Sequence, residues 1–192
     1  MDRMDEARTI AKAETERRQN MQYDYSLHFV PIRDYAVKLA EITGADKEVV
    51  ELAAWLHDLG RVRAGTAESH HVTGAQEARN IMKNLGYPEK TIKHVEDCIL
   101  EHTCEPGLPQ PKTLESRIVS SADAMAHYDT IPWLLSVSLR KHGGDMKQSV
   151  AWVLEKVNRG WEKKILIPEG KKIVEEKYKA AKLLLESTLA LL

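Results

Sequence analysis

The sequence has 192 residues, of which 43% are hydrophobic and 30% charged, a composition typical of a folded protein with one sizeable core. Its 28 basic and 29 acidic side chains give a formal charge of −1, which excludes a general attraction to nucleic acid or to an anionic membrane but leaves a local basic pocket open. No run approaches the roughly 20 apolar residues of a spanning helix. The N-terminus has no leader-like segment, and Cys98 and Cys104 form no paired motif, so we expect no disulfide and a cytoplasmic location.

Apolar residues recur at helical spacing along almost the entire chain, without the alternation of a strand, so we predict an all-α, multi-helix bundle. The expected helices cover residues 2–19, 27–42, 46–60, 71–85, 88–102 and 113–128, followed by two or three beyond Pro132 and a last one from about Glu169. Gly60 should end the third helix, with Asp46 as its N-cap. Residues 61–69 should form a loop, as should residues 103–112, which contain three prolines and would suit a lid.

We expect residues 1–192 to form a single domain. Its central part, residues 26–130, carries the candidate functional residues, between an N-terminal helix at 2–19 and C-terminal helices at 131–192. The charged first helix and the leucine-rich last helix could pack against a second copy of the chain as readily as against the core. The sequence is therefore compatible with a homodimer.

Titratable side chains recur at the predicted helix ends, and His57 and Asp58 are adjacent in such a position. Neighbouring helical residues project about 100° apart, so the two cannot both point into a core, but both can reach an ion beyond the helix end. His28 and Asp123 would complete a set of two histidines and two aspartates that suits a divalent cation. Each residue taken alone is more often a hydrogen-bonded core group or a helix cap.

Other candidates receive no role at this point. We expect the remaining histidines on solvated faces or at helix caps: His70, His94, His127 and His142. The four tryptophans should pack in the core rather than stack on nucleobases.

The ordered set of motifs resembles the HD-domain superfamily of metal-dependent phosphohydrolases, in particular small bacterial and archaeal members. The resemblance covers about residues 26–130 and rests on His28, His57 with Asp58 in "LAAWLHDLG", His71 before Gly74 and Ala75, His102 after "CIL", and Asp123 after "SRIVS". It implies that His28, His57, Asp58 and Asp123 bind a metal ion. It also implies that His71 and His102 contact the scissile phosphate, or hold a second ion bridged by Asp58.

Departures from the family pattern bear on the substrate. Arg61 stands where the deoxynucleotide 5′-phosphatases carry a catalytic glutamate and the alarmone hydrolases a Glu-Asp pair. The segment "TCEPGLPQP" lacks the signature of the cyclic dinucleotide phosphodiesterases. Ala124 and Ala126 replace a lysine and an aspartate that often follow the last ligand. The resemblance therefore favours none of these three substrate classes.

The expected function is hydrolysis of a phosphomonoester or phosphodiester, of a nucleotide by preference, through attack of a hydroxide supplied by the metal. Asp58 or Asp123 would orient the water, and His71 and His102 would stabilise or protonate the phosphate oxygens. Arg61, Arg63 and Lys112 could bind further phosphates or be solvated loop cations. The sequence does not identify the metal among Mn, Fe, Co, Ni, Mg and Zn, and the site could hold one or two ions. The alternative is a non-catalytic module that senses a metal or a nucleotide.

Overall fold

The computed structural model describes residues 2–17, 24–64 and 70–192, and within these ranges the chain forms helices and no strand. This confirms the all-α prediction. The elements are α1 (Arg3–Arg17), η1 (Tyr25–Phe29), α2 (Val30–Thr43), α3 (Lys47–Leu56), α4 (Leu59–Ala64), α5 (His70–Asn84), α6 (Glu89–Glu101), α7 (Leu114–Asp129), α8 (Ile131–Lys141), α9 (Met146–Arg159), η2 (Gly160–Lys164) and α10 (Pro168–Leu189). The labels η1 and η2 mark single turns of π-helix.

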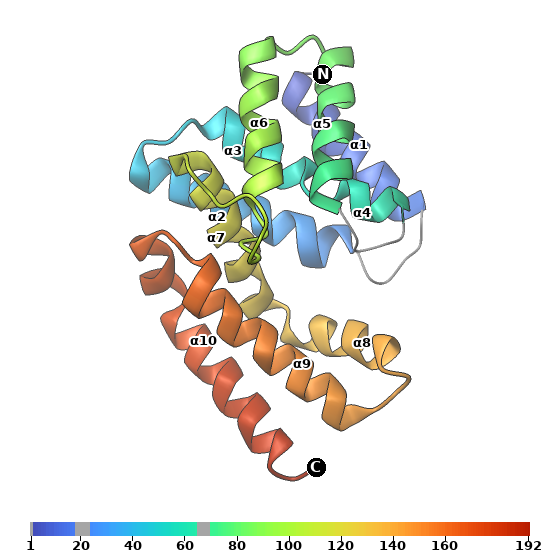
Figure 1. The fold of residues 1–192 in the computed structure, drawn as a ribbon, viewed down its shortest axis with the longest axis vertical. Coiled ribbons are helices and arrows are strands. Elements are labelled where there is room, and N and C mark those ends of the chain that lie inside the picture. The colour runs from blue at the N-terminus through green and yellow to red at the C-terminus, as the bar shows by residue number, and fades with distance from the viewer. Residues whose placement is uncertain (1, 18–23, 65–69) are drawn as a thin grey trace.

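The helices lie on two sides of α7 (Figure 1). On one side α5 and α6 run side by side; α3 contacts both of them and α7, and α2 packs against α3 and α7. On the other side α8, α9 and α10 form a second layer, with η2 against α7. Side chains of α7 can therefore meet groups from both parts of the chain.

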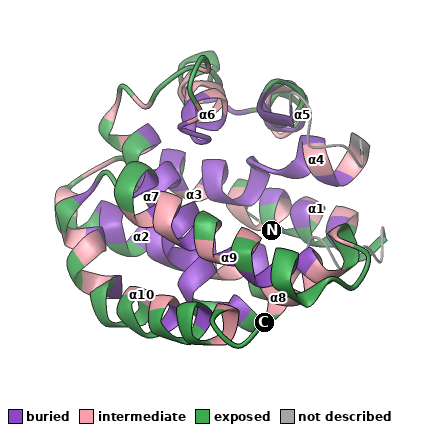
Figure 2. Cartoon of the chain, turned by 60° about the horizontal axis from the view of Figure 1, so that its bottom comes forward, coloured by how far each residue is buried: buried purple, intermediate pink, exposed green. Residues whose placement is uncertain are grey.

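The α7 helix is buried at every residue from Ile118 to Tyr128, and Figure 2 shows it in the buried centre of the molecule. Five of the eleven residues in this run are alanine or serine, and such small side chains let neighbouring helices approach closely. Asp123 is the one carboxylate in the run. A buried carboxylate needs a compensating charge, so its surroundings indicate a site rather than a solvated cap.

Two N-caps fix the start of helices that carry site residues. Asp46 accepts a hydrogen bond from the Val49 amide at the start of α3, as predicted. Thr113 and Ser116 form a capping box at the start of α7. Both caps satisfy amide groups that a helix start would otherwise leave without partners.

The prediction that Gly60 ends the third helix is wrong. The α3 helix ends at Leu56, His57 and Asp58 form a turn, and α4 begins at Leu59, so residues 61–64 of the expected loop are helical. Residues 65–69 of that loop, like residues 18–19 of the first expected helix, lie outside the described residues.

Gly60 instead lets α4 lie close against α5. A Cβ atom on Gly60 would lie 2.3 Å from the backbone nitrogen of Gly74, and one on Gly74 would lie 2.6 Å from the His57 carbonyl oxygen. Neither approach leaves space for a side chain. The glycine pair thus brings the turn of His57 and Asp58 against the first turns of α5.

Among the described residues, no helix has both the length and the apolar character required to cross a bilayer.

Candidate metal centre

Ionisable side chains from several helices line a cavity of about 360 Å³, and seven of them make up the candidate metal centre. They are His28 of η1, Asp58 before α4, Arg61 of α4, His70 of α5, His102 after α6, and Asp123 and His127 of α7. Most of them stand at helix ends, where a side chain can point beyond the helix into a shared space. The fully buried His57 adjoins the set, because its ring centroid lies 5.4 Å from that of His28 and 5.1 Å from that of His102.

Asp58 lies between two groups of histidines. Its Oδ2 atom is 3.1 Å from Nε2 of His28 and 3.8 Å from Nε2 of His57. Its Oδ1 atom faces the other way, 3.8 Å from Nε2 of His70. The Arg61 guanidinium lies 3.7 Å from Oδ2. One carboxylate therefore presents an oxygen atom to each of two sets of imidazole nitrogens.

Backbone carbonyl groups fix the orientation of two of these imidazoles. Nδ1 of His57 lies 3.0 Å from the Ala54 carbonyl oxygen, and Nδ1 of His102 lies 2.6 Å from that of Ile99. A carbonyl oxygen can only accept, so Nδ1 carries the proton in both rings and Nε2 keeps a free lone pair. This arrangement is typical of histidines that bind a metal through Nε2.

Two buried polar atoms at the centre of the site make no hydrogen bond within the described residues, namely Nε2 of His57 and Oδ1 of Asp58. Leaving such atoms without a partner is costly. Both atoms can donate an electron pair, so a cation bound beside each atom would satisfy it. The donor set therefore fits a divalent metal ion.

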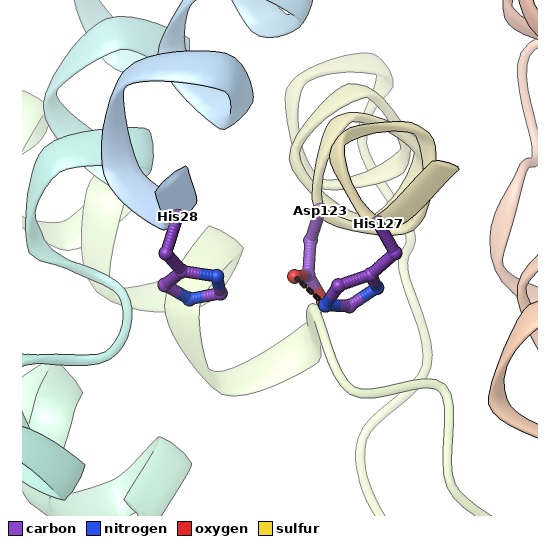
Figure 3. Close-up of side chains that lie close together, drawn as sticks. All are labelled: His28, Asp123 and His127. Atoms are coloured by element: carbon purple, nitrogen blue, oxygen red, sulfur yellow. Dashed lines mark ion pairs between the residues drawn. The ribbon is translucent and has the colours of Figure 1, made fainter. Parts of the chain in front are cut away.

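A third group of donors lies on the side of α7. Figure 3 shows Asp123 and His127 extending from that helix towards His28, with the dashed line marking the contact between them. Nε2 of His127 lies 3.7 Å from Oδ1 of Asp123, and the rings of His28 and His127 are stacked with centroids 6.1 Å apart. The Lys164 ammonium group of η2 forms a buried ion pair with Oδ2 of Asp123.

Burial lowers the pKa of three imidazoles, those of His57, His102 and His127, because a low-dielectric environment disfavours the charged ring. The charge of Lys164 contributes to the lowered pKa of His102, and that of Lys156 to the lowered pKa of His127. All three rings are therefore neutral at neutral pH. Neutral imidazole is the form that binds metals.

The two carboxylates are ionised. Burial alone would raise the pKa of Asp58 and Asp123, but nearby groups lower each pKa below its ordinary range. For Asp58 the contributions come from His57, from the hydrogen bond with His28 and from His102, and for Asp123 the largest such contribution comes from the Lys164 ammonium. The site thus combines neutral imidazoles with negative carboxylates.

Three overlapping groups of donors could each hold a metal ion, because the ligand atoms within each group all lie within 4.8 Å of one another. They are His28 with His57 and Asp58, Asp58 with His70 and His102, and His28 with Asp123 and His127. All four residues proposed as metal ligands from the sequence belong to one or more of these groups: His28, His57, Asp58 and Asp123.

The structure brings His70, and not the predicted His71, into the site. His71 is buried beside His70, with ring centroids 5.8 Å apart, but belongs to none of the three groups found among the described residues. Adjacent residues of a helix point in different directions, so only one of this pair can face Asp58. The sequence offered two neighbouring histidines, and the choice between them depended on how α5 rotates against α4.

His70 and His127 were expected on solvated faces or at caps, but both are buried and line the cavity. A signal for His127 was present in the sequence, because it stands four residues after Asp123 and therefore on the same helical face. His94 and His142 do lie as expected. His94 is part-exposed beside Glu115, and His142 caps the end of α8.

The three predicted substrate-binding cations lie in different surroundings. Arg61 lines the cavity, and its Nη2 atom is 3.2 Å from both ring nitrogens of His70. Arg63 points away and forms ion pairs with Glu14 and Glu77, which join α1, α4 and α5.

Lys112 forms an ion pair with Glu101, 3.4 Å away, and is absent from the cavity lining. Of the tryptophans expected in the core, Trp55 is buried there, whereas Trp133 and Trp152 line the cavity.

The fold and the site define the class: an all-helical protein with a buried cluster of histidines and aspartates that can hold a divalent metal. The sequence matches the HD domain over residues 26–127, and the chain belongs to this family of metal-dependent phosphohydrolases.

Several known proteins are similar to this chain. The uncharacterized protein MJ0778 of Methanocaldococcus jannaschii is 36% identical over 110 residues, which cover 50% of this chain and 62% of that protein. A tRNA (cytidine(56)-2′-O)-methyltransferase of Thermoplasma volcanium is 33% identical over 110 residues, covering 52% of this chain and 31% of the enzyme. The chain thus spans less than two thirds of either relative.

A crystal structure of a predicted HD superfamily hydrolase from an uncultured Thermotogales bacterium has the same fold. Its TM-score is 0.68 with 19% sequence identity, over 98% of this chain and 92% of that one. The similarity thus includes the C-terminal helices, which lie beyond the residues matched to the HD domain.

Proposed function

We propose that the protein is a divalent-metal-dependent phosphohydrolase that cleaves a phosphomonoester or phosphodiester, with a nucleotide as the preferred class of substrate. His28, His57, Asp58 and Asp123 would hold one ion. His70 and His102 would hold a second, with Asp58 bridging the two. Relative to the prediction from sequence, His70 takes the place of His71.

The observation that carries this proposal is the position of Asp58, whose two oxygen atoms face different histidines. A bridging carboxylate requires this geometry, and a carboxylate in an ordinary ion pair does not. Nε2 of His57 and Oδ1 of Asp58, which make no hydrogen bond within the described residues, add to the argument, because there is one such donor atom on each of the two sides of Asp58.

When bound, a divalent ion lowers the pKa of a coordinated water to near 7 and so makes a nucleophile available at neutral pH. The protein's own groups would do the rest. Arg61, whose guanidinium lies beside Asp58 and His70, would supply positive charge to the oxygens of a bound phosphate. Lys164 holds Asp123 in place through their buried ion pair.

A second candidate is a non-catalytic module that binds a metal or a nucleotide. The similarity to a tRNA methyltransferase favours it, because that relative's name describes transfer of a methyl group and not hydrolysis. The same site would then bind its ligand without turnover.

One experiment separates the two candidates. The purified chain would be analysed for bound metal by mass spectrometry, then assayed for phosphate release from a panel of nucleotides with added Mn²⁺, Co²⁺, Ni²⁺ or Mg²⁺. We expect bound metal and metal-dependent release of phosphate. Metal without turnover on any nucleotide supports the sensor. A chain that retains no metal contradicts the hydrolase and a metal sensor, and leaves only a module that binds a nucleotide.

A further inference from the structure

The C-terminal helices line the cavity with positive charge. Four basic side chains face it from this part of the chain: Lys141 of α8, Lys156 and Arg159 of α9, and Lys164 of η2. All four lie beyond residues 26–127, which match the HD domain. The family resemblance therefore assigns them no role.

Two of these cations are paired with carboxylates of the protein. Lys164 forms its ion pair with Asp123, and Arg159 lies 3.4 Å from Glu105. Their charge is already partly compensated within the protein.

Lys141 and Lys156 contact an aromatic ring, whereas Lys164 and Arg159 contact carboxylates. The ammonium groups of Lys141 and Lys156 lie 4.9 Å and 5.6 Å from the centre of the Trp152 ring. Within the described part of the chain neither forms an ion pair; Glu155 also lines the cavity, but it is exposed and pairs with neither lysine. An aromatic face attracts an ammonium group without neutralising it, so both charges stay available to a ligand.

Lys156 lines the same cavity as Asp123 and His127 of the candidate metal centre, and its electrostatics agree with this position. Burial lowers its pKa to about 8; the Asp123 carboxylate opposes this lowering, whereas the positive charges of Lys164 and Arg61 add to it. In return, the charge of Lys156 helps to lower the pKa of Asp123 and of His127. A group of cations that disfavour one another's charge in a cavity would be stabilised by an anion.

We propose that Lys141 and Lys156 form a second anion subsite, which binds a phosphate group of the substrate other than the one at the metal centre. This inference rests on the proposed function. It narrows the substrate class to compounds with at least two phosphate groups, such as nucleoside polyphosphates or bisphosphates. The cavity of about 360 Å³ lies within the range of ligand pockets and admits more than a single phosphate.

The test compares orthophosphate with pyrophosphate, which occupy one and two phosphate positions. The full chain would be loaded with Mn²⁺, freed of excess metal by dialysis and titrated with each anion in a calorimeter at one fixed salt concentration. Bound metal would be measured before and after each titration. We expect pyrophosphate to bind about tenfold more tightly than orthophosphate.

Lys156→Gln should remove most of this preference for pyrophosphate while changing orthophosphate affinity by less than about twofold. Lys141→Gln should have a smaller effect in the same direction, and Lys156→Arg should retain the preference. Lys171→Gln is the matched control, because Lys171 also lies over a tryptophan ring, 5.3 Å from the centre of Trp161, but does not line the cavity. Thermal melting of each variant checks that it is folded.

Three results would overturn the subsite. The first is equal affinity of the wild-type chain for orthophosphate and pyrophosphate, and the second is an equal loss of affinity for the two anions in Lys156→Gln. The third is a loss of the preference for pyrophosphate in Lys171→Gln as large as that in Lys156→Gln. These outcomes differ from failure of the proposed function. A chain without turnover whose pyrophosphate binding still depends on Lys156 keeps the subsite and loses the hydrolase. A chain that releases phosphate but has no preference for pyrophosphate keeps the hydrolase and loses the subsite.

Discussion

Asp58 has neighbours on both sides, and its two oxygens are directed to separate imidazoles of His28 and His70. A single substitution at this position should therefore affect every ion that the site holds. Removing a histidine from one side should affect a single ion. The residues of the site can thus be tested separately.

Asp58→Asn keeps the shape of the side chain but removes its charge. We expect loss of all bound metal and a fall in phosphate release of at least about 100-fold, because the amide cannot bridge two cations. Metal content and activity would be measured together, with circular dichroism to follow helix content. His94→Ala serves as the control, since His94 is a part-exposed histidine paired with Glu115 outside the cavity. Full metal occupancy in Asp58→Asn would refute the ligand assignment.

The neighbouring histidines at the start of α5 provide a second test at this scale. His70→Ala should remove metal or lower turnover by about tenfold or more, because the ring lies beside Asp58 and His102. His71→Ala should leave both quantities within about twofold of the wild-type values. Metal analysis and steady-state kinetics on the two variants measure the metal content and the turnover. Reversed effects would show that α5 is rotated relative to the arrangement described here.

At the scale of elements, the contact between α4 and α5 sets the position of the turn that carries His57 and Asp58. Gly60 and Gly74 make this contact without side chains. The sequence indicates a glycine near the end of a helix, but the tertiary contact shows that its role is close packing.

Gly60→Ala should destabilise the fold by about 1–3 kcal/mol, because the added Cβ would collide with the backbone of α5. Urea denaturation monitored by circular dichroism measures this change. Gly170→Ala is the matched control, since its Cβ would meet only side chains, the nearest being Met125 Sδ at 3.0 Å, which can move. Equal stability of the two variants would contradict the close packing of α4 on α5.

At the scale of the molecule, the buried titratable groups make stability depend on pH. His57, His102 and His127 have lowered pKa values in the folded state, whereas in the unfolded chain each titrates near its ordinary value of about 6.5. Below about pH 6.5 the unfolded chain takes up protons that the folded protein does not, so folding loses free energy as the pH falls. The lowered pKa values of Asp58 and Asp123 extend this loss to pH values below about 4.

We therefore expect the melting temperature of the chelator-treated protein to fall as the pH is lowered from about 7.5 to 5.5. Each histidine should reduce the free energy of unfolding by up to about 1.4 kcal/mol per pH unit. Differential scanning calorimetry at several pH values measures the slope. His127→Gln removes one of the three titrating rings, so its stability should decline less steeply over the same range. A wild-type melting temperature that rises on acidification would show that the imidazoles are not held neutral.

The sequence by itself determined the features that depend on local chemistry. Helical periodicity indicated the all-α class, and Asp46 marked the start of α3 because an N-cap needs only its own helix. The pair of His57 and Asp58, with His28 and Asp123, could be selected as candidate ligands since few other residue types bind a divalent ion.

Only the tertiary structure decided which side chains share the cavity, because such choices depend on helix rotation and on packing between distant segments. The rotation of α5 places His70 beside Asp58 in place of His71. The packing of α4 turns Arg63 towards α1 and away from the site. Lys156 lines the cavity of the candidate metal centre because α9 packs near α7, a contact between segments that no local pattern encodes.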